Sequence, residues 1–252
     1  MTAKQTLDTA QSLYEKKLIT YPRTDSQYLT EDMEQTARNV VRQIYEKYQL
    51  TDPFDQPEQP DVKKVMNNSK VTDHHAIIPT MELASCHLDE LKSWEEKILF
   101  LIAVHTVMAM SKDHIYQETE IEVECQGEIF KAKGRTVLQD GWKLFENCFK
   151  NKDRMAIVDP DQEMKERMPK VTQGQTFYAV AAEKTEHFTS PPKPYSEDTL
   201  LAAMETAGNK EFDEDTEKKG LGTPATRAGI IEKLIYSQSV SYTHLTLPTT
   251  ER

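Results

Sequence analysis

The chain has 252 residues and a mass of 29.0 kDa, which is enough for one large domain or for two or three small ones. Hydrophobic residues make up 37% of the sequence, and the longest apolar run, residues 98–110, is too short to span a membrane. The net charge of −11 argues against a general nucleic-acid binder, because a DNA-binding surface is usually basic.

Residues 1–110 are predicted to be mainly helical. Apolar residues recur at helical spacing over Thr2–Lys17, and Thr2 has the side chain of a good N-cap. A second helix is expected over Thr30–Tyr48, with Thr30 as its N-cap. The three prolines of residues 52–60 indicate a loop.

A third helix is predicted from the apolar run that ends at Met110. The residues just before this run, Ser93-Trp94-Glu95-Glu96, have the pattern of a capping box that opens with Ser93. We therefore expect a buried helix that begins at this serine.

The pattern changes from helix to strand near Ser111. Residues 118–125 alternate strictly, with four glutamates on one face, and Gln126-Gly127 predicts a turn into a returning strand over 129–133. Further short strands are predicted at 137–138, 156–158 and 177–180. Residues 111–190 are therefore expected to form a small antiparallel β region.

A third section, residues 191–236, begins with two prolines and is predicted to be helical. Ser196 should cap a helix over Glu197–Thr206, and Thr223-Pro224 should open another over Ala225–Ile235. The acidic run at 211–217 between them indicates a solvated loop. The last residues, 237–252, resemble translated sequencing-adapter read-through, so we expect this tail to be foreign and to carry no function.

Tyr21 follows the first predicted helix, and Pro22 biases it away from helical backbone, so we expect a turn that presents the phenol. A tyrosine oxygen can attack a phosphodiester, and Arg23 can neutralise the charge that gathers on the phosphorus oxygens. Three alternatives stay open from these residues alone. The tyrosine could pack its ring beneath a loop, Arg23 could form a surface ion pair with Asp25, and Asp25 could cap the turn.

Residues 19–26, ITYPRTDS, closely resemble the active-site motif of type IA DNA topoisomerases, and the proline after the tyrosine resembles the topoisomerase III branch. Three further segments resemble motifs of this family and follow in the family's order. They are residues 72–80, TDHHAIIPT, residues 191–200, PPKPYSEDTL, and residues 220–228, GLGTPATRA. The resemblance extends over about Thr2–Ile235.

The resemblance implies that Tyr21 is the nucleophile of transient single-strand DNA cleavage, with a 5′-phosphotyrosine intermediate, strand passage and religation without ATP. Arg23 would grip the phosphate and Asp25 would orient its neighbours. His74 stands at the position of the family's histidine, where it would hydrogen-bond a DNA phosphate or tune the site by protonation. The neighbouring His75 is given no role.

The two later motifs imply contacts to single-stranded DNA. Phosphate contacts from Lys193 and base stacking on Tyr195 are expected, and a helix N-terminus beside Arg227 favours phosphate. The implied groove residues are Lys193, Tyr195, Ser196, Thr199 and Arg227. A purely structural role for each of these residues stays equally open.

The family's magnesium-binding acidic cluster belongs to an N-terminal domain that has no counterpart in this sequence, so we assign no metal ligand here. We expect Mg²⁺ to bind in that absent domain, and we interpret the chain as a fragment of a monomeric enzyme. An odd number of cysteines, with no metal-ligand spacing, indicates a reduced protein in the cytoplasm, where the family would associate with the nucleoid.

The expected fold class is thus an α+β multidomain protein. Residues 1–110 would form a mainly helical, winged-helix-like tyrosine domain, residues 111–190 an antiparallel β gate region, and residues 191–236 a helical piece of the DNA groove. The alternative is a non-catalytic single-stranded DNA-binding module in which Tyr21 is structural. A third reading, a helical protein that binds other proteins, is favoured only by the acidic balance.

Overall fold

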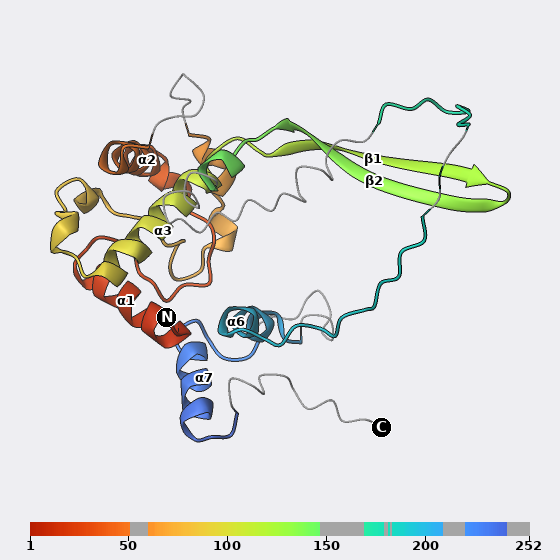
Figure 1. Ribbon diagram of the computed structural model, residues 1–252. Helices are drawn as coiled ribbons and strands as arrows, with labels where there is room; N and C mark the ends of the chain where they lie inside the picture. The colour runs from red at the N-terminus through yellow and green to blue at the C-terminus, as the bar shows by residue number, and fades with distance from the viewer. Residues whose placement is uncertain (51–59, 147–168, 179–180, 182, 209–219, 241–252) are drawn as a thin grey trace. The chain divides into compact units, whose positions relative to one another are not determined.

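The computed structural model describes residues 1–50, 60–146, 169–178, 181, 183–208 and 220–240 (Figure 1). The chain packs as two compact units: one contains Met1–Met110 and Pro191–Arg252, and the other contains Ser111–Ser190. The described residues include both helices and an antiparallel sheet, which confirms the predicted α+β class. None of the helices within these ranges is both long and apolar enough to cross a membrane.

Along the chain, the two described strands come after one group of helices and before another. The α-helices are α1 (Ala3–Glu15), α2 (Glu34–Tyr48), α3 (Ser93–Ala109), α6 (Glu197–Thr206) and α7 (Arg227–Tyr236). Short 3-10 turns are η1 (Glu31–Met33), η2 (Val62–Val65), η3 (Asn68–Lys70), η4 (Met81–Leu83) and η5 (Leu88–Glu90). The strands are β1 (Ile115–Cys125) and β2 (Glu128–Gln139).

The first helix has the cap that its sequence predicts. The Thr2 hydroxyl accepts a hydrogen bond from the Gln5 N–H at 3.2 Å, and the Gln5 side chain accepts one from the Thr2 N–H at 3.0 Å. At the other end Lys17 has a φ of 61°, and the Leu18 N–H returns to the Leu13 carbonyl at 2.9 Å. This reversal directs the chain out of α1 and into the segment that holds Tyr21.

The predicted caps of the next two helices are wrong. Thr30 precedes the 3-10 turn η1 and its side chain makes no capping bond. The first free N–H, that of Glu31, donates to the Asn68 side chain at 2.9 Å. Ser93 lies inside α3, whose N-cap is Lys92. The Lys92 N–H donates at 3.0 Å to Glu95, which is three residues on and therefore in reach.

The core of the first unit forms where α1 and α2 pack against α3. Its largest fully buried side chains are Leu13, Ile19, Leu29, Val40, Ile44, Val62, Pro79, Leu83 and Leu99. Two of them, Ile19 and Leu29, lie on either side of the Tyr21 segment. Burial of apolar side chains therefore anchors both ends of this segment.

Glu95 joins α1 to α3 through an ion pair with Lys16, in which Glu95 is buried and Lys16 is exposed. Glu95 is 2% exposed, and its carboxylate accepts hydrogen bonds from Ser12 Oγ at 2.7 Å and from Lys16 Nζ at 2.6 Å. Burial of the carboxylate raises its pKa, but the hydrogen bonds from Lys16, Ser12 and the Lys92 N–H outweigh burial and lower the pKa from 4.5 to about 2. We call these residues, Ser12, Lys16, Lys92 and Glu95, the Glu95 clamp.

The clamp predicts a loss of stability in acid. Because the folded-state pKa of Glu95 is depressed, its contribution is present above pH 4.5 and is lost as the pH falls from there toward about 2. The loss is at most about 3 kcal/mol in the free energy of unfolding. Urea unfolding of the chain across this window measures it. Glu95→Gln should remove this part of the acid dependence. Glu96 is the exposed neighbour of Glu95, and the control variant Glu96→Gln should keep the acid dependence. Equal acid dependence in both variants would contradict the clamp.

The second unit contains a two-stranded antiparallel ribbon. Gln126 and Gly127, at φ 53° and 87°, make the predicted turn between β1 and β2. The predicted strands at 129–133 and 137–138 are parts of one continuous strand, since cross-strand pairing extends from Glu128 to Gln139. The strand predicted at 177–180 is wrong for residues 177 and 178, which have no strand partner; residues 156–158 and 179–180 lie outside the described residues.

Paired charges line one face of this ribbon. Arg135 Nε donates to Glu118 at 3.0 Å and Lys133 Nζ lies 3.1 Å from Glu120, each pair directly opposite across the strands. Lys131 pairs with Glu122 in the same way one step farther. The glutamates of β1 are therefore neutralised locally by the basic residues of β2.

The two C-terminal helices begin differently. Ser196 caps α6 as predicted, and the helix ends at Thr206 as predicted. Helix α7 begins at Arg227, two residues later than predicted, because the Thr226 N–H closes a turn onto the Thr223 carbonyl at 2.9 Å. The acidic run at 211–217 and most of the tail, 241–252, lie outside the described residues.

Candidate functional site

The segment that holds Tyr21 is paired with the segment of the second motif. Ile19 and Pro79 form an antiparallel bridge. The Thr20 N–H donates to the Ile78 carbonyl at 3.0 Å, and the Thr80 N–H donates to the Leu18 carbonyl at 3.0 Å. This pairing brings two motifs that are more than fifty residues apart in sequence to one place.

Two threonine hydroxyls strengthen the pairing. Thr20 Oγ1 donates to the Ala76 carbonyl at 3.1 Å and accepts from the Ile78 N–H at 3.0 Å. Thr24 Oγ1 donates to the His74 carbonyl at 2.9 Å. The backbone on both sides of Tyr21 is therefore tied to the backbone that carries His74.

The Tyr21 ring is half-buried and contacts two other rings. Its centroid lies 4.3 Å from that of His74, with the planes inclined by 40°. The second ring is Tyr14 of α1, at 5.4 Å and an interplanar angle of 80°. The structure thus brings together Tyr21 and His74, two residues that the sequence predicts to be catalytic.

Arg23 and Asp25 are both exposed beside this ring cluster. Within the described ranges no ion pair joins them, so the structure does not favour the alternative in which they neutralise each other. The turn's own hydrogen bonds come from Thr24, whose hydroxyl accepts from the Ser26 N–H at 3.1 Å, and from Ser26, whose hydroxyl accepts from the Tyr28 N–H at 3.2 Å. Arg23 is therefore accessible to an anion from solvent.

His75 contacts its own backbone. Its Nδ1 lies 2.8 Å from the Ala76 carbonyl, which only accepts, so the ring nitrogen donates. This local bond accounts for His75 without a role in chemistry.

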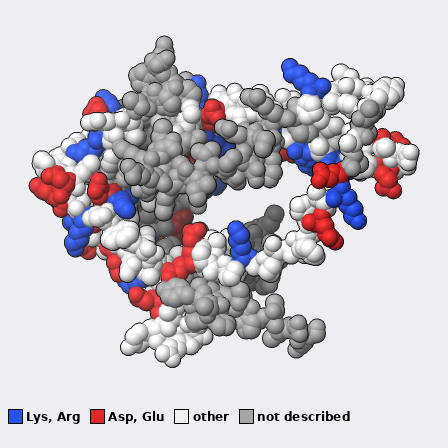
Figure 2. Space-filling model, viewed as in Figure 1, with Lys and Arg blue, Asp and Glu red and all other residues white. Residues whose placement is uncertain are grey.

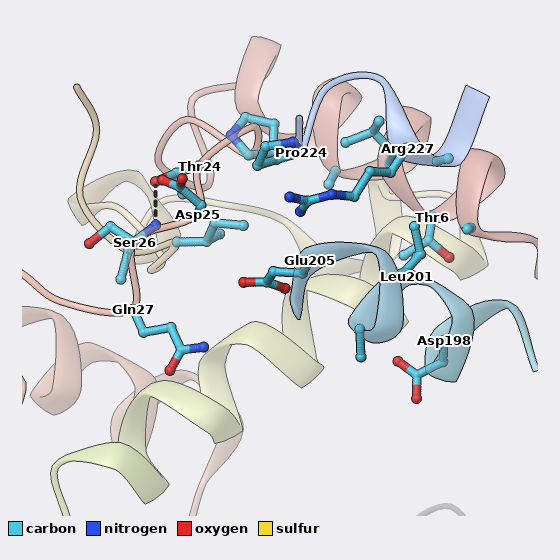
Figure 3. A pocket seen from close by; sticks show the side chains of 18 residues that line it. Thr6, Thr24, Asp25, Ser26, Gln27, Asp198, Leu201, Glu205, Pro224 and Arg227 are labelled. Carbon is cyan, nitrogen blue, oxygen red and sulfur yellow. Dashed lines mark hydrogen bonds between the residues drawn. The ribbon is translucent and has the colours of Figure 1, made fainter. Parts of the chain in front are cut away.

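A pocket of about 610 Å³ lies beside the Tyr21 segment, within the same unit. Its walls come from α1, from the residues that follow Tyr21, and from α6 and α7. Figure 3 shows Asp25, Asp198, Glu205 and Arg227 around it, among apolar side chains. In the described part of the chain no three His, Cys, Asp or Glu side chains are grouped to hold a metal ion, so these carboxylates do not fit a Mg²⁺ site.

The five predicted groove residues differ in what their side chains do. Arg227 is 8% exposed and donates from Nε to the Leu221 carbonyl at 3.1 Å and from a terminal nitrogen to the Gly222 carbonyl at 3.3 Å. Ser196 and Thr199 form the capping box of α6. These three residues therefore have structural hydrogen bonds that account for them, whereas Lys193 and Tyr195 are exposed.

Basic and acidic side chains are interspersed over the face seen in Figure 2. The described basic residues of the ribbon are largely paired with glutamates, as the cross-strand ion pairs show. The basic side chains of the ribbon are therefore largely neutralised by the glutamates opposite them.

Sequence reasoning missed three features that build the site. They are Tyr14 against Tyr21, the double hydrogen bond of Thr20, and Glu95 as the partner of α1. The spacing of Ser12 and Lys16, one helical turn apart, places both on one face and is the signal that could have indicated a shared partner. No local signal identifies that partner as Glu95, because it comes from a distant helix.

Replacing Thr20 by valine, a side chain of the same shape without the hydroxyl, should destabilise the chain. The change leaves the Ala76 carbonyl and the Ile78 N–H without the hydroxyl, which costs about 1–3 kcal/mol in the free energy of unfolding. Urea unfolding measures the loss. The control is Thr206→Val, since the exposed Thr206 hydroxyl bonds only a carbonyl of its own helix at 3.0 Å. An equal effect of both substitutions would show that Thr20 does not tie the two segments.

A family model described as DNA topoisomerase matches residues 1–251. The chain is 38% identical over 250 residues to DNA topoisomerase 3 of Bacillus licheniformis, a match that covers 92% of this chain and 32% of the relative. It is 37% identical over 241 residues to DNA topoisomerase 3 of Vibrio cholerae, with 92% of this chain and 35% of the relative covered.

A solved structure supports the same fold. The chain is similar to full-length topoisomerase I from Thermotoga maritima, with a TM-score of 0.55 and 23% identity, over 94% of this chain and 35% of that one. The chain therefore spans about a third of the length of the proteins that it matches.

Proposed function

The chain belongs to the DNA topoisomerase family, and we propose that it carries the nucleophilic tyrosine of a type IA enzyme of the topoisomerase III kind. One observation supports this most strongly: the Tyr21 and His74 rings, from two separate motifs, lie 4.3 Å apart. A tyrosine beside an imidazole and an accessible guanidinium has the groups that attack on a phosphodiester requires.

In the proposed reaction the Tyr21 oxygen attacks the phosphorus of one DNA strand. The phenol loses its proton as the new O–P bond forms, and the bond from phosphorus to the 3′ oxygen breaks. The 3′ oxygen takes up a proton as it leaves, and the 5′ phosphate stays on Tyr21 as an ester. Attack of the 3′ hydroxyl after strand passage reverses these steps, so the ester conserves the bond energy and ATP is not needed.

The neighbouring residues have distinct proposed roles. Arg23, exposed and without an ion pair to Asp25 in the described residues, would bind the phosphate oxygens through two hydrogen bonds. His74 would donate to a phosphate oxygen from the edge of its ring. Asp25 would orient Arg23 once DNA is bound. Each role uses a side chain of the turn or of the segment paired with it.

Single-stranded DNA is the proposed substrate. Lys193 and Tyr195 are exposed at the entry to α6, where a cation could contact phosphate and a ring could stack on a base. Ser196, Thr199 and Arg227 would contribute through their helix ends while they keep their structural bonds. The whole protein is proposed to act as a monomer on nucleoid DNA.

Residues beyond this chain are proposed to complete the site. Mg²⁺ would be held there, since the carboxylates described here do not fit it, and it would supply positive charge near the DNA phosphates. We further propose that residues 1–110 form a winged-helix-like tyrosine domain, that the β ribbon belongs to the gate, and that residues 191–236 belong to the groove. The tail at 237–252 is proposed to be foreign to the protein.

The runner-up function is a non-catalytic single-stranded DNA-binding module. It is favoured by the half-buried Tyr21 ring, because packing against two rings is also what a structural tyrosine does. The two proposals differ in whether a covalent bond to DNA forms.

The covalent bond is tested by Tyr21→Phe. We expect the wild-type residues, placed in the aligned segment of the B. licheniformis enzyme, to form a detergent-resistant adduct with labelled single-stranded DNA and Mg²⁺. The variant should form none, because it lacks the attacking oxygen, and should still bind DNA. Gel electrophoresis after a detergent quench measures the adduct. Binding without an adduct in either protein would support the DNA-binding module instead.

Arg23 should control the rate of the same reaction. Arg23→Ala is expected to slow single-turnover cleavage about 10²- to 10³-fold, since it removes a charge aimed at the phosphorus oxygens. Arg23→Lys should recover part of the rate, because it keeps the charge but loses the two-pronged geometry. Arg42→Ala, at an exposed position of α2, is the matched control. Cleavage at the wild-type rate by Arg23→Ala would exclude this role.

A further inference from the structure

The Tyr21 ring touches another tyrosine from the preceding helix. The Tyr14 ring centroid lies 5.4 Å away and the two planes meet at 80°, the edge-to-face geometry that aromatic pairs prefer. Tyr14 is 39% exposed, so it is not a core residue whose purpose is to fill space. The edge-to-face contact with Tyr21 is therefore the interaction of the Tyr14 ring that the described residues define.

The backbone under Tyr14 is held firmly. The preceding residue, Leu13, is fully buried, and the Glu95 clamp grips α1 through residues on both sides, Ser12 and Lys16. The Tyr14 carbonyl accepts from the Lys17 N–H at 2.8 Å, which closes the last turn. These contacts anchor the backbone from which the Tyr14 ring reaches Tyr21.

A fixed surface matters for a nucleophile at the end of a rotatable side chain. The Tyr21 oxygen must sit about 3–3.5 Å from phosphorus in line for attack, and a misplacement of about 1 Å can cost two orders of magnitude in rate. Contacts from His74 and from Tyr14 both restrict rotation of the Tyr21 ring. Of these two rings, that of Tyr14 comes from outside the segments on which the proposed reaction depends.

We propose that Tyr14 is a positioning residue for the nucleophile: its ring, held on α1 by the Glu95 clamp, aims the Tyr21 phenol at the scissile phosphate. The inference rests on the proposed function. Tyr14 acts through the contact of its ring with Tyr21, so the aromatic ring of Tyr14 is required and its hydroxyl is not.

Kinetics on three variants test this proposal in the same B. licheniformis background. Tyr14→Leu should slow single-turnover cleavage about 3- to 10-fold, the value of one aromatic contact, with unchanged DNA affinity by fluorescence anisotropy. Tyr14→Phe should restore the wild-type rate. Tyr236→Leu, which removes a ring that is 89% exposed, is the control and should have no effect.

The results separate this proposal from the proposed function. A wild-type protein that forms no adduct contradicts both. An adduct that forms in the wild type and at the same rate in Tyr14→Leu overturns the role of Tyr14 alone. A rate lost equally in Tyr14→Leu and Tyr14→Phe also overturns it, because ring contact would then not be the cause.

A spectroscopic measurement on the 252-residue chain itself needs no activity. With ¹³C-labelled tyrosine, the ring signals of Tyr21 should move in Tyr14→Leu, because they lose the ring current of a neighbour at 5.4 Å. They should stay close to wild type in Tyr14→Phe. Tyr21 signals that do not move in Tyr14→Leu would show that the contact is absent in solution and would overturn the proposal.

Discussion

Thr20 and Ile78 are joined twice, by the Thr20 N–H to the Ile78 carbonyl and by the Ile78 N–H to the Thr20 hydroxyl, both at 3.0 Å. This joint holds two short irregular segments, and both segments carry residues of the proposed site. The next residue, Tyr21, follows the joint directly, and His74 precedes it by a few residues on the partner segment. Together with the Thr24 hydroxyl, which donates to the His74 carbonyl at 2.9 Å, this joint holds the phenol and the imidazole close to each other.

The acidic balance of the chain is compatible with the proposed DNA-cleaving site because many of the charged side chains are neutralised by neighbours. On the ribbon, glutamates of β1 form ion pairs with basic residues of β2. In the Glu95 clamp, the charge of Glu95 is neutralised by Lys16. Arg23, two residues after Tyr21, remains exposed and could meet a phosphate, as the proposed function requires. A net charge of −11 therefore describes the whole surface and says little about the few positions that would meet a phosphate.

Local signals in the sequence predicted the elements whose caps are self-contained. Helices α1 and α6 begin as expected because Thr2 and Ser196 bond within their own first turn. The Thr30 side chain makes no capping bond, and Asn68 from a distant segment takes the N–H of Glu31. The cap of α3 lies one residue before Ser93, at Lys92, where the Lys92 N–H donates to Glu95. Asn68 is 37 residues from Glu31, so no short stretch of sequence around Thr30 contains this partner.

Within the candidate site, too, local sequence predicts some residues and not the contacts that support them. Tyr21, Arg23 and His74 were predicted from motifs, since their residue types and order carry the signal, and their roles stay predictions. The supporting contacts of Tyr14, Thr20 and Glu95 were not, because each depends on which surfaces pack together. Arg227 shows the reverse case: its motif suggested a DNA contact, yet its guanidinium bonds two carbonyls of its own turn.

The central claim is that Tyr21 forms the covalent bond to DNA, and the most direct measurement is to locate that bond. The chain would be placed in the B. licheniformis enzyme, trapped on single-stranded DNA, and digested with protease and nuclease for mass spectrometry. Our account predicts a nucleotide on the peptide that contains Tyr21, attached through its 5′ phosphate. A nucleotide on any other tyrosine, or attachment through a 3′ phosphate, would contradict it.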